Sequence, residues 1–291
     1  MASSGSGYDL SSSTFSPDGR IFQIEYAAKA VENAGTALGL RCRDGIVLAV
    51  EKPLVNRMLV AKTTGRRIHT VDEYAGLAIT GFVSDGRQIV NRAREEASNY
   101  EETYGTKIPP ETLSARISTY VHYFTLHGAL RPFGASTLVA AYDPGTKRHS
   151  LHMIEPSGVC YEYYGAAAGR GRQLARTEME KLSINPARVA SGGGEGEGGG
   201  GGGGAITVAD GVRQLAKIIH SLRDDAKDKP FELEMSWLCE GSGWKHQGVP
   251  RDVIADAVEW AKKEIKDNAE DEDDDDDDEE EEVGGGDVME E

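Results

Sequence analysis

Cysteine is scarce in this 291-residue sequence, which contains only Cys42, Cys160 and Cys239. An odd number of widely spaced cysteines does not form the disulfide framework of a small secreted domain, and the spacing matches no zinc motif. We therefore interpret the three as buried thiols of a protein from a reducing compartment. No motif for a cofactor or a metal ion accompanies them, and we expect neither.

Long apolar runs are missing as well. No segment reaches the roughly 18 uninterrupted apolar residues that favour a membrane-spanning helix. Residues Met1–Gly7 have neither the basic start nor the apolar run of a secretory signal. We therefore expect neither a membrane partner nor secretion.

The chain also lacks an excess of positive charge. Its formal net charge is −17, from 49 acidic and 32 basic residues. Residues 267–291 hold 17 of the acids and no base, so the remainder is balanced at 32 against 32. Because a nucleic-acid-binding surface needs an excess of Lys and Arg, we expect no nucleic-acid partner.

Hydrophobic residues make up 38% of the chain, which is enough for a substantial core, and their periodicity predicts the first elements. Two strands should flank the turn Arg43–Gly45, because Asp-Gly between apolar runs favours a hairpin. Another strand is predicted near Tyr74–Gly81. Apolar residues spaced by three and four then predict two helices, at about 84–104 and, after two prolines, at about 110–128.

The second half of the chain returns to strands and then to helices. Strands are predicted at 136–142, 149–154, 158–167 and 231–237, and helices at 171–182, 208–222 and from Pro250 to near Lys266. Ser191–Gly204 is almost entirely glycine, whose ordering has a high entropy cost, so it is predicted to be a disordered insertion. Runs of strands separated by pairs of helices predict an α+β fold with antiparallel sheets covered by helices on their outer faces.

Several stretches resemble a known family. The segment "GYDLSSSTFSPDGRIFQIEYAAKAV" is similar to the N-terminal signature of proteasome α-subunits, and "GTALGLRCRDGIVLAVEK", "GFVSDGR" and "RPFGAS" also look like that family. The similarity covers about residues 7–182 and 206–266, and within the family it is strongest to the α7 type of eukaryotes. It implies a four-layer αββα sandwich of two antiparallel sheets, the fold of the N-terminal-nucleophile hydrolases.

The resemblance also implies a plan of domains and a role. Residues 1–34 would form a gate tail and leader helix, residues 35–266 the sandwich with its insertion, and residues 267–291 an acidic tail. The chain would be a non-catalytic subunit of the α-ring of the 20S core particle, in contact with two α neighbours and with β-subunits. It would support assembly, gating of substrate access and activator docking in ubiquitin-dependent protein degradation. Regulatory caps and unfolded polypeptide substrates would be further partners, in the cytoplasm and the nucleus.

The sequence does not supply the catalytic centre of the family's β-subunits. Those enzymes use an N-terminal threonine, whose hydroxyl attacks the carbonyl while its own amine takes the proton. Gapless alignment puts Gly35 at that position, with Glu51 and Arg67 where the enzymes have aspartate and lysine. Gly35 has no hydroxyl and follows 34 residues, so we expect no catalytic residue. The rival hypothesis is an autonomous hydrolase that uses Thr36 after cleavage, although Thr36 would be one residue out of register.

The leader has features that suit a gate. Ser16 and Pro17 favour the start of a helix, and Met1–Ser13 is rich in glycine and serine, which makes it easy to order and release. By resemblance, the helix would lie on the outer face of the ring and the preceding residues over its axial pore. Leu10 replaces the arginine usual in the family. The residues that match the family's gate cluster are Tyr8, Asp9, Pro17 and Tyr26.

The resemblance further implies a pocket between neighbouring subunits that binds the C-terminal tails of activators. The matching residues are Ala34, Arg67 and Phe82, with Arg67 in place of the more usual lysine. An arginine suits a carboxylate because its guanidinium can donate two parallel hydrogen bonds. The alternative is that Arg67 is a solvated charge at a strand edge.

Thirteen consecutive acids, Glu270–Glu282, repel one another and have no apolar partner. The tail is therefore predicted to be disordered. Solvation is the simplest interpretation, and a docking arm for basic partners is the functional one. The tail alone also favours a third hypothesis, in which the chain is an acidic chaperone for basic proteins.

Overall fold

The structure is a computed structural model that describes residues 7–54, 56, 58–60, 64–182, 206–223 and 229–282. Residues 1–6 of the leader and the whole glycine-rich insertion 191–204 lie outside the described residues. The described part contains two five-stranded sheets. Each pair of neighbouring strands is antiparallel.

The first sheet has the strand order β10-β9-β2-β1-β8, and the second has the order β3-β4-β5-β6-β7. The strands of the first sheet are β1 (Ala37–Cys42), β2 (Gly45–Pro53), β8 (Gly165–Ala168), β9 (Phe231–Cys239) and β10 (Gln247–Gly248). Those of the second are β3 (Ile68–Asp72), β4 (Ala75–Gly81), β5 (Ala135–Asp143), β6 (Arg148–Ile154) and β7 (Cys160–Tyr163). The predicted hairpin at Arg43–Gly45 is the β1–β2 turn.

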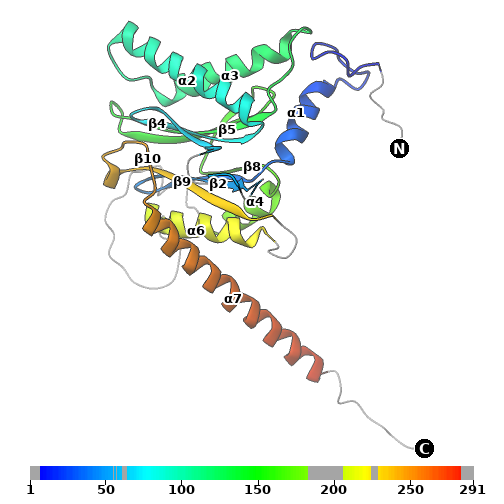
Figure 1. Cartoon of the computed structure of the whole chain (residues 1–291), viewed down its shortest axis with the longest axis vertical. Helices are drawn as coiled ribbons and strands as arrows, with labels where there is room; N and C mark the ends of the chain where they lie inside the picture. Colours follow the sequence, from blue (N-terminus) through cyan, green and yellow to red (C-terminus); the bar gives the residue numbers. More distant parts are fainter. Residues whose placement is uncertain are drawn as a thin grey trace, which may run out of the picture.

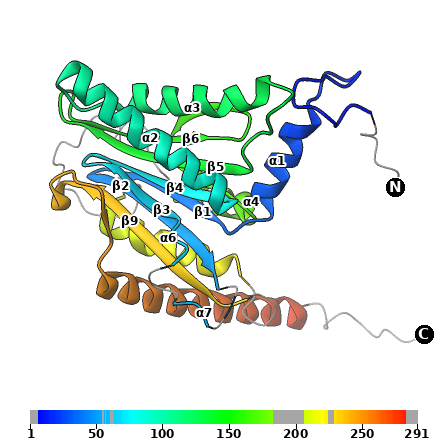
Figure 2. The ribbon, with the colours of Figure 1, turned by 45° about the horizontal axis from the view of Figure 1, so that its top comes forward.

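Helices cover the outer faces of both sheets. Figures 1 and 2 show α2 and α3 on the outside of the second sheet, α6 and α7 on the outside of the first, and α1 at one end beside both. The helices are α1 (Phe22–Glu32), α2 (Val83–Tyr104), α3 (Pro110–Leu126), α4 (Arg172–Lys181), α6 (Val208–Ser221) and α7 (Arg251–Glu282), with a 3₁₀ turn at Glu240–Ser242. The predicted four-layer αββα sandwich is therefore confirmed. Within the described ranges, no helix has the length and apolar content needed to cross a membrane.

The strands of the first sheet separate two apolar layers, because successive side chains of a strand point to opposite faces. Leu38 and Leu40 of β1 pack toward α6, whereas Ala37 and Leu48 pack between the two sheets. Every residue of β1 is buried. Because both faces of these strands are buried, the sequences of β1 and β2 are continuously apolar and do not alternate between apolar and polar residues.

The leader helix begins later than predicted. Ser16 and Pro17 do not start α1; they belong to a turn in which the Ser16 hydroxyl accepts a hydrogen bond from Arg20 N at 3.1 Å. Gly19 has φ +75°, a left-handed conformation that a right-handed helix does not accommodate. Helix α1 can therefore begin only after Gly19, and its first residue is Phe22.

The last helix is longer than predicted. Its backbone continues through the acidic run to Glu282, so the expected end near Lys266 is wrong, while the disorder of the acidic tail stays a prediction. The reason lies in the sequence, which has neither glycine nor proline between Arg251 and Glu282; these are the residues that most strongly break a helix. Residues 283–291 of the predicted tail lie outside the described residues.

Replacing Leu48 tests the layer between the sheets. Leu48 is 1% exposed, so Leu48→Ala should lower the free energy of unfolding by about 2–5 kcal/mol through lost burial and a new cavity. The matched control, Leu174→Ala, removes the same atoms from a side chain that is 63% exposed and should change stability by less than about 1 kcal/mol. Urea unfolding monitored by circular dichroism measures both. Equal losses would contradict the assigned core.

Candidate functional site

The chain that enters β1 is held by backbone contacts from several elements. The carbonyl of Ala34 accepts a hydrogen bond from Arg170 N at 2.9 Å, and the carbonyl of Thr36 accepts one from Glu51 N at 2.8 Å. The hydroxyl oxygen of Thr36 accepts a third from Gly171 N at 3.1 Å. We call residues 34–36 with these contacts the β1 junction. Thr36 is 1% exposed, whereas Ala34 and Gly35 are half-buried, so the junction is buried at Thr36.

No side chain fits at Gly35. A Cβ atom there would collide with the carbonyl oxygen of Glu51. Gly169 also packs against Gly35, and its φ is +102°. A Cβ atom at Gly169 would lie 2.5 Å from Gly35 O. The position predicted to correspond to a catalytic threonine is therefore occupied by main chain alone, and that chain continues backward through Ala34 into α1.

Glu51 and Arg67 do not form a catalytic pair with this junction. The Glu51 carboxylate is buried and accepts hydrogen bonds from Thr36 N at 3.0 Å and from the guanidinium of Arg223. The side chains of Arg223 and Glu51 are 3% and 4% exposed. Arg67 instead donates to the carbonyl of Gly81 at 2.8 Å. A carboxylate bound in this way holds β1, β2 and Arg223 together.

The structure brings together part of the predicted gate cluster. Tyr26 donates from its hydroxyl to Asp9 Oδ2 at 3.4 Å, and Gln23 donates from its side chain to Asp9 O. Partial burial and then the nearby Asp9 charge raise the pKa of Tyr26. Tyr8 and Pro17 are exposed and join neither of these contacts.

The leader is anchored by a residue that sequence analysis missed. The hydroxyl of Ser12 donates to His127 O at 2.8 Å and lies 3.1 Å from Leu130 O, just after α3. Ser12 is buried, whereas the nearby side chains of Leu10 and Phe15 are exposed, Leu10 by 87%. Nothing distinguishes Ser12 within a run of serines, so no sequence signal reveals the anchor. It fixes the base of the leader and leaves an apolar surface on either side.

The three predicted pocket residues lie near one end of the sandwich. Ala34 and Arg67 are half-buried and Phe82 is exposed. The backbone N–H groups of Arg67 and Ile68 donate to the carboxylate of Glu234. Burial lowers the pKa of the Arg67 guanidinium, although arginine stays charged at neutral pH. Arg67 is therefore not the freely solvated charge that was the alternative.

Two of the quoted motifs meet behind Phe82. Asp85 of "GFVSDGR" accepts hydrogen bonds from both terminal nitrogens of Arg131 of "RPFGAS", at 2.6 and 2.8 Å, and from Gly134 N at 3.0 Å. Phe82 N in turn donates to Gly134 O at 2.9 Å. The Arg131 hydrogen bonds are the main reason that the pKa of Asp85 is lowered from its usual value. This cluster fixes the backbone that presents Phe82.

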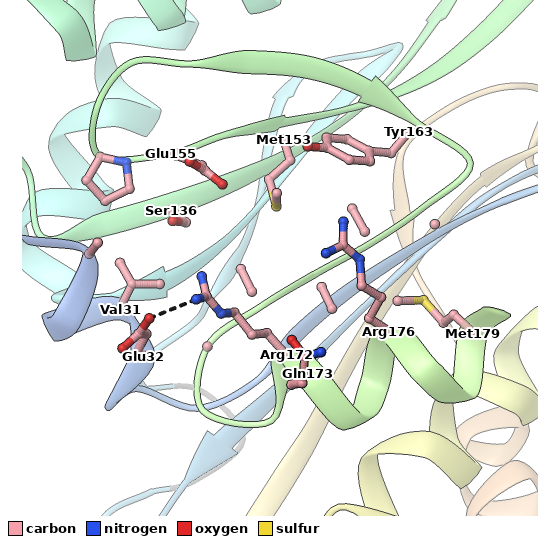
Figure 3. A pocket seen from close by; sticks show the side chains of 17 residues that line it. Val31, Glu32, Ser136, Met153, Glu155, Tyr163, Arg172, Gln173, Arg176 and Met179 are labelled. Carbon is pink, nitrogen blue, oxygen red and sulfur yellow. Dashed lines mark ion pairs between the residues drawn. The ribbon is translucent and has the colours of Figure 1, made fainter. Parts of the chain in front are cut away.

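A cavity of about 250 Å³ separates α1 from α4. Figure 3 shows Glu32 at the end of α1 facing Arg172 at the start of α4, and the two form an ion pair at 2.9 Å. Met153 and Tyr163 of the second sheet also line this cavity. The pair ties the leader helix to the start of α4.

Comparison with known protein families gives matches to two adjoining segments of the chain. The family described as "Proteasome subunit" matches residues 31–187, and the N-terminal signature of A-type proteasome subunits matches residues 8–30. The chain belongs to the proteasome α-subunit family. The predicted family is thus confirmed, and the signature covers the leader and most of α1.

Full-length relatives support the assignment to this family. The alpha type-3 proteasome subunit of Acanthamoeba castellanii is 49% identical over 90% of this chain and 96% of its own length. The protein of the same name from Arabidopsis thaliana is 48% identical over 92% and 98%. The probable alpha type-7 proteasome subunit of Schizosaccharomyces pombe is 40% identical over 94% and 98%. These names confirm the predicted likeness to the α7 type.

Replacing Asp85 tests how much its hydrogen bonds with Arg131 and Gly134 stabilise this α-subunit. Asp85→Asn should lower the free energy of unfolding at neutral pH by about 1.5–3 kcal/mol, because hydrogen bonds to a charged group are lost. The folded pKa of Asp85 is lowered below the unfolded value of about 3.9, so its contribution is complete above that pH. The contribution disappears as the pH falls through the folded pKa. Denaturant unfolding at a series of pH values measures this.

The exposed Asp256 provides the control, because Asp256→Asn removes the same charge from a solvated helix surface. Its unfolding free energy should parallel that of the unmodified chain at every pH. A difference between Asp85→Asn and the unmodified chain that stays constant into strong acid would contradict the assigned role of Asp85.

Proposed function

We propose that this chain is a non-catalytic α-ring subunit of the 20S core particle. The observation that carries the proposal is the β1 junction, in which Gly35 has no room for a side chain and is preceded by the leader helix α1. A threonine hydrolase needs a hydroxyl and a free amine on the same terminal residue. This junction offers neither, and the family membership supplies the context of the ring.

The chain contacts other α-subunits through two different surfaces and β-subunits through a third. A closed ring of single subunits is built from heterologous interfaces, so the two sides of each subunit differ. The two sides of this sandwich do differ: the edge strands are β3 and the short β10 on one side, and β7 and β8 on the other. This asymmetry supports a place in such a ring.

The leader gates the passage of unfolded polypeptides into the particle. The residues that precede Ser12 form the movable part, and the contacts of Ser12 with the end of α3 provide its fixed base. The Tyr26–Asp9 contact is available for exchange with the tyrosine or aspartate of a neighbour, and Tyr8 and Pro17 are exposed for the same purpose. Exposed Leu10 adds an apolar contact where the family usually has a charged one.

Activators of the particle dock at Arg67 with Ala34 and Phe82. One terminal nitrogen of Arg67 holds Gly81 O, which fixes the guanidinium while leaving other donors for a carboxylate. The Asp85 cluster positions Phe82 beside it. With regulatory caps as its partners at this pocket, the subunit acts in protein degradation in the cytoplasm and the nucleus.

The autonomous-hydrolase hypothesis is disfavoured by the same junction. Thr36 N donates to Glu51, and the Thr36 hydroxyl oxygen accepts from Gly171 N. Cleavage before Thr36 would have to reach a peptide bond against which Gly169 packs closely. The chaperone hypothesis depends on the acidic tail alone, and nothing in the sandwich adds to it.

Deleting residues 1–13 tests the gating role. Assembled particles that carry this deletion should hydrolyse a short fluorogenic peptide several-fold faster without an activator, because the pore is left partly open. Deletion of the glycine-rich residues 191–204 is a control of similar length and should leave both assembly and basal hydrolysis unchanged. Native gels confirm assembly of each particle. Unchanged hydrolysis after the leader deletion, in particles that assemble normally, would reject gating by this chain.

A further inference from the structure

The cavity between α1 and α4 reaches into the middle of the sandwich. Its lining residue Ser136 comes from β5, the central strand of the second sheet. Met153, Tyr163 and Ala166 also line it, and all three belong to the apolar layer between the two sheets. The inner end of the cavity is therefore enclosed by this subunit and does not lie on the outer surface of an edge strand.

Two hydroxyl groups that face this cavity have no hydrogen-bond partner. Ser136 is 4% exposed, yet its hydroxyl makes no hydrogen bond to any residue that the structure describes. The same is true of the half-buried Tyr163 hydroxyl. Buried polar groups of folded proteins nearly always have a partner. The two hydroxyls therefore offer hydrogen bonds that a bound molecule can use.

Two charges of opposite sign in the cavity are also unpaired. The carboxylate of Glu155 and the guanidinium of Arg176 form no ion pair and no side-chain hydrogen bond within the described ranges. Figure 3 shows Arg176 extending from α4 toward Tyr163, with Glu155 on the other side of the cavity. Burial raises the pKa of Tyr163, the Glu155 charge raises it further, and Arg176 lowers it. Both charges thus act on one hydroxyl without pairing with each other.

The remaining charges of the cavity neutralise each other, because Glu32 and Arg172 form the ion pair that joins α1 to α4. Apolar side chains complete the lining, among them Val31 of α1, Met153 of β6 and Met179 of α4. A few polar groups in an otherwise apolar setting are typical of sites that bind and orient a small molecule. A molecule that satisfies this cavity must carry one positive charge, one negative charge and an apolar group.

We propose that this cavity binds a free α-amino acid whose side chain is apolar and about as large as that of leucine. The carboxylate of the ligand pairs with Arg176 and accepts a hydrogen bond from Tyr163. Its ammonium pairs with Glu155, and its side chain packs against Val31 and Met153. At about 250 Å³ the cavity is smaller than pockets for drug-sized molecules, which occupy roughly 300 Å³ or more. The proposal goes beyond the α-ring role and does not depend on it.

Other ligand classes fit less well. Glu155 would repel a phosphate, and a simple carboxylic acid would leave that carboxylate unpaired. A divalent cation lacks ligands, because the part of the chain that the structure describes has no group of three or more metal-binding side chains. A side chain from a ring neighbour is the main alternative, since β7 and β8 are edge strands. One side chain carries at most one charge, however, whereas the cavity offers two of opposite sign.

Methyl NMR of the full chain with labelled methionines tests the proposal, since Met153 and Met179 line the cavity. L-Leucine should shift both methyl signals. Two analogues each remove one charge of the ligand: 4-methylpentanoate lacks the ammonium, and isoamylamine lacks the carboxylate. Each should bind about tenfold more weakly than leucine, because a hydrogen-bonded charge contact is lost.

Variants assign each charge of the ligand to its partner. Arg176→Gln should weaken leucine binding about tenfold and leave isoamylamine binding unchanged. Glu155→Gln should weaken leucine binding similarly and leave 4-methylpentanoate binding unchanged. Arg213→Gln removes the same charge as Arg176→Gln from an exposed residue outside the cavity and should change neither. Circular dichroism checks that all variants are folded.

The same titration in assembled particles, with methionine labelled in this chain only, separates a free ligand from a side chain of a ring neighbour. The leucine-dependent shifts of Met153 and Met179 should persist there. Four results would overturn the proposal: no shift with leucine, equal affinity for leucine and 4-methylpentanoate, equal effects of Arg176→Gln and Arg213→Gln, or a response that is lost on assembly because a neighbour fills the cavity.

Discussion

The chain's course through Gly35 is the constraint on which the rest of the structure depends. Because the carbonyl of Glu51 and the backbone of Gly169 close on it from two sides, only glycine fits there. The neighbouring contacts of Ala34 and Thr36 tie the leader, β2 and the start of α4 to this one point. These contacts join the leader to the sandwich, since helix α1 ends at Glu32, just before this point.

Two further polar side chains, those of Asp85 and Ser12, hold backbone segments beside exposed apolar residues. The carboxylate of Asp85 is hydrogen-bonded to Arg131 and Gly134, so it holds the backbone around Phe82 in place. Ser12 holds the base of the leader while Leu10 stays exposed. Polar side chains that sequence patterns single out thus act mainly by holding neighbouring backbone in place.

Much of the fold follows from the sequence, since long periodic segments such as 84–104 and 208–222 specify helices that must cover apolar strands. The errors have local causes: a left-handed Gly19 delays α1, and the absence of any helix breaker extends α7 through the acids. The site was less predictable. Gly35 and Glu51 could be placed by resemblance. The partner of Glu51 is Arg223, and that of Ser12 is the backbone at the end of α3. Both partners are far away along the chain, and no sequence pattern predicts such contacts.

The central claim is that the β1 junction never becomes a catalytic terminus. Intact-mass measurement of this chain, isolated from assembled particles after treatment with a threonine-directed covalent inhibitor, tests it most directly, with the catalytic β-subunits of the same sample as the positive control. The account predicts a chain that retains its leader and carries no inhibitor. A chain that begins at Thr36 and carries the inhibitor would contradict it.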